Sequence, residues 1–70
     1  MSSVKVKKEN PGIAKAIAVA GSQVNLAEML DCTQPNVFRW LYHQVPAERA
    51  VQIEKVTGVS RRLMRPDLFR

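Results

Sequence analysis

The stretch QVNLAEMLDCTQPNVFRW, residues 23–40, decides the fold of this chain. It has the pattern of two short helices joined by a turn at Asp31. Ala27 is a small residue at the point where two steeply crossed helix axes would approach each other, and small side chains permit that approach. The apolar side chains that would close the seam are Leu26, Leu30, Cys32, Val37 and Trp40. This spacing predicts a helix-turn-helix with Trp40 in the core.

The outer face of the second of these helices suits a DNA major groove, where polar side chains reach base edges. Gln34 can pair with adenine through both ends of its amide, and Arg39 can address guanine or else a phosphate. Phe38 is an exposed aromatic whose partner would be a thymine methyl group; the alternative is that it folds back into the core. The predicted base-contacting residues are Gln34, Pro35, Asn36, Phe38 and Arg39.

Local signals predict further helices on both sides of this motif. The residues placed to begin helices are Asn10 with Pro11, Ser22, Thr33, Pro46 and Ser60. Of these, Asn10, Ser22, Thr33 and Ser60 can cap their helices with a side-chain oxygen. The residues placed to end helices are Gly21 and Gly58. Apolar residues recur at helical spacing in the segments between. The sequence therefore predicts an all-α domain of four to five helices over residues 10–70. A short β-ribbon in the last dozen residues is the alternative, which Pro66 and the lack of alternation disfavour.

Composition limits the classes of protein to which the chain can belong. Its 70 residues allow one domain, and 46% hydrophobic residues exclude a wholly disordered chain. No apolar run approaches the roughly 20 residues of a membrane span, and no secretory signal is evident, so we expect a cytoplasmic protein. A single cysteine and a single histidine favour neither a disulfide nor a metal site. The absence of a nucleophile paired with a base and of a glycine-rich phosphate loop argues against an enzyme and against a cofactor.

Positive charge is concentrated at the two ends of the chain. Residues 1–9 carry a net charge of +2 and residues 61–70 a net charge of +3, whereas the residues between them are formally neutral. We expect residues 1–9 to form a flexible basic arm. Basic ends of this kind either only solubilise a protein or bind phosphates, and beside a helix-turn-helix phosphate binding is favoured. The predicted phosphate-contacting residues are Gln23, Thr33, His43, Arg61 and Arg62.

One helix in the groove reads only a few base pairs, too few to define one genomic site. We therefore expect a homodimer on near-palindromic operator DNA, with the free protein monomeric. The candidate dimer patch is apolar and lies near the C-terminus, unless these side chains cover the domain's own core. It consists of Met64, Leu68 and Phe69.

Several motifs resemble the YdaS-like Cro proteins of phages and prophages. The motifs are Gln23-x3-Ala27, Val37-x2-Trp40, Val45-Pro46-Ala47-Glu48-Arg49, Ile53-Glu54-x2-Thr57-Gly58-Val59-Ser60-Arg61 and Leu63-x-Arg65-Pro66-Asp67. The first two are shared by many helix-turn-helix proteins, and the others are more specific to this group. The resemblance covers roughly residues 13–69. It implies a small, all-helical transcriptional regulator that binds operator DNA, commonly repressing it.

The sequence departs from the pattern of these proteins in two places. Asp31 stands where they usually have glycine, and the link Tyr42-His43-Gln44 lacks their glycine and arginine. An antitoxin-like or anti-repressor module, which uses the same helical scaffold to bind protein, is the alternative function.

Overall fold

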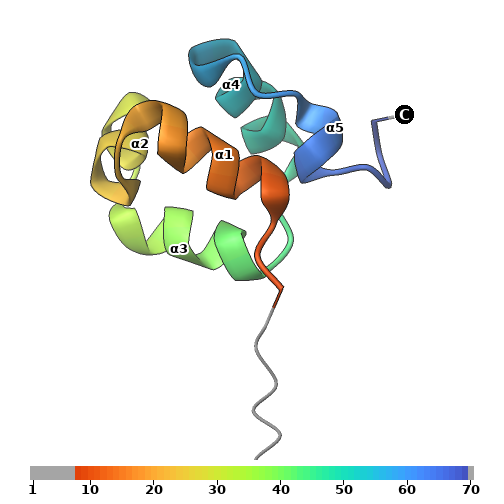
Figure 1. The fold of residues 1–70 in the computed structure, drawn as a ribbon, viewed down its shortest axis with the longest axis horizontal. Helices are drawn as coiled ribbons and strands as arrows, with labels where there is room; N and C mark the ends of the chain where they lie inside the picture. The colour runs from red at the N-terminus through yellow and green to blue at the C-terminus, as the bar shows by residue number, and fades with distance from the viewer. Residues whose placement is uncertain (1–7, 70) are drawn as a thin grey trace, which may run out of the picture.

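The computed structural model describes residues 8–69, and within them it contains five helices and no strand (Figure 1). The helices are α1 (Pro11–Ala20), α2 (Gln23–Met29), α3 (Gln34–Tyr42), α4 (Ala47–Thr57) and α5 (Arg61–Met64). The prediction of an all-α fold is confirmed, and the β-ribbon alternative is wrong for residues 59–69. The predicted arm, residues 1–9, lies outside the described residues except for Lys8 and Glu9.

The predicted helix ends are found at most of the expected residues. The side chain of Asn10 accepts hydrogen bonds from the backbone of the first turn of α1, and Ser22 and Ser60 cap α2 and α5 in the same way. Gly21 ends α1 with φ 103° and Gly58 ends α4 with φ 79°, in the region that favours glycine.

Thr33 occupies the N-cap position of α3, but its side chain makes no capping hydrogen bond. A capping side chain accepts from the second or third backbone N–H of the helix. Here the second residue is Pro35, which has no N–H, and the N–H of Asn36 donates to the backbone carbonyl of Thr33 at 3.1 Å. The prediction that the Thr33 side chain caps α3 is therefore wrong.

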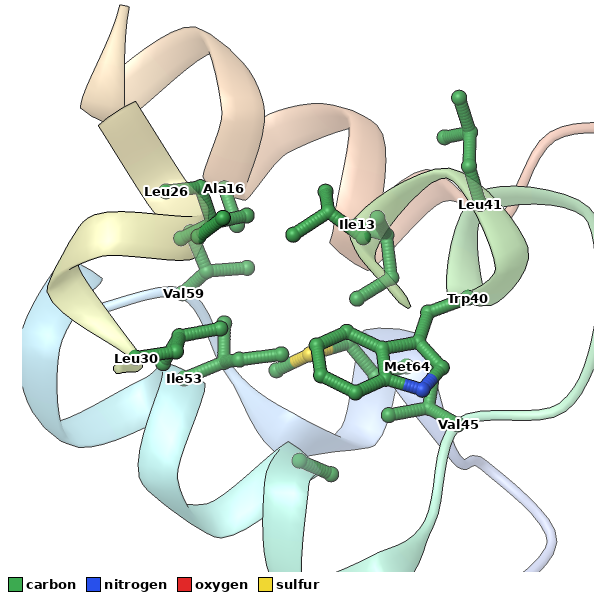
Figure 2. Close-up of a cluster of buried hydrophobic side chains, with 13 residues drawn as sticks. Ile13, Ala16, Leu26, Leu30, Trp40, Leu41, Val45, Ile53, Val59 and Met64 are labelled. Atoms are coloured by element: carbon green, nitrogen blue, oxygen red, sulfur yellow. The ribbon is translucent and has the colours of Figure 1, made fainter. Parts of the chain in front are cut away.

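All five helices contribute side chains to one core, together with the two links that flank α4 (Figure 2). Trp40 is only 6% exposed, which confirms its place on the inner face of α3. The buried hydrophobic residues are Ile13, Ala16, Leu26, Ala27, Leu30, Val37, Trp40, Leu41, Val45, Ala50, Ile53, Val59 and Met64. Cys32 is partly buried and packs against them.

Helix α1 lies between α3 on one side and α4 and α5 on the other (Figure 1). It approaches α5 so closely at Gly12 that a Cβ atom there would lie 2.8 Å from the backbone nitrogen of Met64. The side-chain amide of Asn10 also donates to the carbonyl of Met64 at 3.0 Å. The seam between α1 and α5 therefore joins the two ends of the described chain.

This seam corrects the predicted dimer patch. Met64 is 2% exposed and belongs to the core, because Gly12 leaves room for it against α1. Phe69 is half-buried against the core, with the Arg61 guanidinium 5.0 Å from the centre of its ring. Of the three residues in the patch, only Leu68, which is 50% exposed, is available to a partner.

The residues after α5 are held to the link between α3 and α4. The guanidinium of Arg65 donates to the Val45 carbonyl at 2.6 Å and makes two hydrogen bonds, at 2.8 and 3.0 Å, to the carboxylate of Asp67. The hydrogen bond to Arg65 lowers the pKa of Asp67, and the pair raises the pKa of Arg65. The C-terminal turn is thus fixed to the core by one arginine.

Candidate nucleic-acid interface

Helices α2 and α3 form the predicted helix-turn-helix. Asp31 in the turn has φ 55°, the left-handed conformation in which glycine is usual. The backbone N–H of Cys32 donates to the Ala27 carbonyl at 2.9 Å, and Ala27 itself is 3% exposed at the crossing. The predicted roles of Asp31 and Ala27 are confirmed.

Arg49 on α4 contacts both helices of this motif on its inner side, a role that was not predicted from the sequence. Its guanidinium donates to the Leu30 carbonyl at 3.1 Å, at the C-terminal end of α2, and lies 5.5 Å from the centre of the Trp40 ring. A cation suits both positions, because the end of a helix and the face of an indole are electron-rich. The resemblance of residues 45–49 to a specific family motif was the one available signal for Arg49.

The outer face of α3 presents most of the predicted base-contacting side chains. Pro35, Phe38 and Arg39 are exposed, whereas Gln34 and Asn36 are partly buried. Phe38 is 51% exposed, so the alternative that it folds back into the core is wrong. Among residues 8–69, no ion pair holds the Arg39 guanidinium. This face therefore combines a free cation with an exposed aromatic ring.

Four residues of this face surround an open hollow of about 420 Å³. They are Pro35, Phe38, Arg39 and His43. Their spacing of three, four and eight residues from Pro35 places them on one side of α3, because the helix repeats every 3.6 residues. His43, the residue just after α3, was predicted to contact phosphate and lies beside the predicted base-contacting residues.

The first residues of α2 and α3 are joined through their side chains. The amide nitrogen of Gln34 donates a hydrogen bond to the amide oxygen of Gln23. Gln34 was predicted to contact bases and Gln23 to contact phosphates, but their contact with each other was not predicted. Thr33 is exposed immediately before Gln34. These three predicted contact residues therefore lie together at the N-terminal end of α3.

Arg61 and Arg62, also predicted to contact phosphate, lie elsewhere. They begin α5, which is separated from α3 by α1 (Figure 1). Both arginines are exposed, and Arg61 forms an ion pair with Glu54 at 3.2 Å in addition to its contact with Phe69. The structure does not bring these two arginines to the α3 surface.

The residues that precede α1 meet the C-terminal end of α3. The backbone N–H of Asn10 donates to the Leu41 carbonyl at 2.7 Å, and the Tyr42 hydroxyl donates to the Glu9 carboxylate at 3.3 Å. Burial, together with the neighbouring Glu9 carboxylate, raises the pKa of Tyr42. The chain therefore joins the folded domain on its α3 side.

Residues 8–69 offer neither a metal-ligand cluster nor a membrane-spanning helix. They contain no group of three or more His, Cys, Asp or Glu side chains that could hold a metal ion. None of their helices has the length and apolar character required to cross a membrane.

Comparison with known proteins supports the resemblance seen in the sequence. The sequence model of the family described as "Bacterial toxin YdaS" matches residues 13–70. A protein of Escherichia coli (strain K12) named "Putative transcriptional regulator YdaS" is 39% identical over 67 residues, which is 90% of this chain and 68% of the relative. No solved structure matches the chain. The extent of both sequence matches shows that this chain belongs to the YdaS family.

Proposed function

We propose that this chain is a transcriptional regulator of the Cro-like repressor type that binds operator DNA by placing α3 in the major groove. The observation that carries the proposal is the face of α3, where Phe38 and Arg39 are exposed on a helix-turn-helix. The name of the similar Escherichia coli protein, a transcriptional regulator, supports the same function. Exposed side chains on the second helix of such a motif are placed to reach base edges.

The roles within this interface follow from position. Gln34, at the N-terminal end of α3, would read adenine, Arg39 would read guanine, and Asn36 and Pro35 would make the neighbouring contacts. Gln23 and Thr33, at the starts of α2 and α3, would hold phosphates, which fixes the register on the duplex without reading its sequence. His43 at the other end of α3 would contact the flanking backbone.

The basic arm, residues 1–9, would supply most of the sequence-independent affinity. The chain between residues 10 and 60 is formally neutral, so the lysines of the arm add positive charge to the single cation of α3, Arg39. The hydrogen bonds of Glu9 and Asn10 to Tyr42 and Leu41 support this role, because they join the arm to the domain beside α3. Neutralised phosphates release counterions, so affinity should fall steeply with salt.

We further propose that two copies bind a near-palindromic operator in the cytoplasm. Helix-turn-helix dimers contact half-sites about 34–36 Å apart, and two copies double the number of base pairs that are read. Leu68, half-exposed on the turn after α5, is the remaining candidate of the original dimer patch. Free protein would be monomeric, because so small an apolar contact gives little association in the absence of DNA.

The experiment that tests the function is a binding measurement at physiological salt. Purified protein is titrated with DNA that flanks its own gene and with a shuffled duplex of equal length and composition. We expect a preference of about a hundredfold or more, with footprints as paired half-sites. Equal weak binding to the two duplexes would contradict specific recognition.

Matched variants then assign the preference to α3. Arg39→Gln and Lys55→Gln each remove one positive charge, but the exposed Lys55 lies on α4, outside the helix-turn-helix. We expect Arg39→Gln to reduce the preference and Lys55→Gln to preserve it. If Arg39→Gln leaves DNA binding unchanged while Phe38→Ala abolishes binding to a protein partner, the antitoxin-like or anti-repressor module is the better description.

A further inference from the structure

The ring of Phe38 packs against another aromatic ring and is otherwise half exposed. Its centre lies 5.1 Å from the centre of the Tyr42 ring, one helical turn later, with the two planes tilted by 59°. Tyr42 is itself held by the hydrogen bond to Glu9. An aromatic pair at this spacing restricts the rotamers of both rings. Phe38 is thus a positioned apolar surface on the face of α3.

The open side of this ring borders the hollow on α3, whose lining has two chemical parts. Pro35 and Phe38 form an apolar wall, and Arg39 and His43 supply the polar part of the lining. Leaving half of a phenylalanine in water is unfavourable in the free protein, so an apolar ligand group would gain by covering it. A polar group placed against the same wall would lose its water without gaining a partner.

Only one apolar group is available on a base edge in the major groove, the 5-methyl group of a pyrimidine. Guanine presents two acceptors there that match an arginine. Resting on the proposed function, we infer that the hollow binds the 5-methyl group of a pyrimidine and that Arg39 reads a guanine beside it. The protein then distinguishes a methylated pyrimidine, either thymine or 5-methylcytosine, from the same base without its methyl group.

Removing one methyl group at a time from the operator DNA tests this inference on the unaltered protein. Each thymine of the preferred duplex is replaced in turn by deoxyuridine, which removes the methyl group and leaves base pairing intact. We expect a loss of about fourfold in affinity at one thymine per half-site, the effect of burying one methyl group. At that position cytosine should bind more weakly than 5-methylcytosine, and this comparison separates the two sources of the methyl group.

Variants connect the methyl group to its site. Phe38→Ala should bind the thymine and deoxyuridine duplexes equally, whereas Phe38→Leu should retain part of the difference. Val19→Ala serves as the matched control, because Val19 is 57% exposed on α1 and does not line this hollow. It should retain the full difference. Thermal unfolding of each variant shows whether it is folded, and the deoxyuridine scan does not depend on any variant.

The outcomes that overturn the inference differ from those that overturn the proposed function. If the operator is preferred over shuffled DNA but no deoxyuridine lowers affinity, the protein is a specific binder and the methyl site is wrong. If the loss at deoxyuridine persists in Phe38→Ala, the methyl group is read by another part of the protein. If no duplex is preferred over shuffled DNA, the proposed function fails, and the methyl site fails with it.

Discussion

The amide nitrogen of Gln34 donates a hydrogen bond to the amide oxygen of Gln23, and so joins the first residue of α3 to the first residue of α2. An amide side chain that is held at one end has fewer orientations to lose when it binds a base. Gln23 therefore acts on Gln34 before any DNA is bound. The proposed base contact of Gln34 and the proposed phosphate contact of Gln23 would therefore be coupled through this hydrogen bond.

The first prediction concerns this pair. Gln34→Ala should reduce discrimination at one A·T pair of the operator by about 1–3 kcal/mol, the value of a good amide–adenine contact. Gln23→Ala should remove a part of the same discrimination, although Gln34 is still present. Competition binding with duplexes altered at one base pair measures both effects. Gln44→Ala, an exposed glutamine in the link after α3, is the control. Unchanged discrimination in Gln23→Ala would show that the bond has no orienting role.

The second prediction concerns the close approach of α1 and α5. In an open helix, glycine to alanine stabilises by about 0.5–1 kcal/mol. Gly12→Ala should instead destabilise by about 1–3 kcal/mol, because its Cβ would meet backbone atoms of Leu63 and Met64 at 2.9 and 2.8 Å. Urea denaturation measures the change. In a Met64→Ala background, Gly12→Ala should still destabilise, since the backbone atoms remain; no further loss in that background would contradict the backbone clash.

The third prediction separates core from surface in the former dimer patch. Met64→Ala should lower the free energy of unfolding by about 2–5 kcal/mol, because it opens a cavity in the core. Leu68→Ala should change it by less than about 0.5 kcal/mol, as expected for an exposed residue. If Leu68 contacts a second copy, Leu68→Ala weakens binding to the paired operator but not to an isolated half-site. Equal effects on the two DNAs would exclude Leu68 from the dimer contact.

The fourth prediction concerns the turn. Asp31 adopts φ 55°, where a residue with a Cβ atom is strained by about 1 kcal/mol. Asp31→Gly should therefore stabilise the protein by about 0.5–1 kcal/mol. Asp31→Ala, which keeps a Cβ but loses the short polar side chain, should not stabilise it. Thermal unfolding of the two variants provides the comparison, and a lower midpoint for Asp31→Gly would contradict strain in this turn.

The fifth prediction concerns acid stability. The pKa of Asp67 lies below the ordinary aspartate value of 3.8 because Arg65 hydrogen bonds to the ionised form. A carboxyl whose folded pKa is lowered stabilises the fold above its unfolded pKa, and this contribution is lost as the pH falls through the folded pKa. The free energy of unfolding of the unaltered protein should therefore decline as the pH falls below 3.8, the ordinary aspartate pKa. The difference from Asp67→Asn, measured by urea denaturation at several pH values, should vanish in acid. A difference that is constant with pH would contradict the ion pair.

Local signals explain why much of the fold was predictable from the sequence. The roles of Asn10, Ser22 and Gly58 depend on residues within one helical turn, and such signals are readable in order along the chain. Trp40 was placed in the core by its spacing from Val37 alone. Thr33 was misassigned as a side-chain cap because the proline after it changes which N–H groups exist.

The parts that the sequence did not predict depend on contacts between distant residues. In the sequence, Met64 is grouped with Leu68 and Phe69 as an apolar patch. Only the approach of α1 at Gly12 places Met64 in the core. The contact of Arg49 on α4 with the end of α2 joins residues that are 19 positions apart in the chain. The bond between Gln23 and Gln34 depends on the crossing angle of their helices, which no local pattern specifies.

The seam between α1 and α5 also determines the order in which the molecule can form. Asn10 and Met64 are 54 residues apart in the chain, and the contact between them requires both α1 and α5. Closing so long a loop has an entropic cost that the contacts of the completed core must offset. Until α5 is made, the face of α1 around Gly12 has no cover. Cover for α1 at Gly12 therefore depends on α5 being in place.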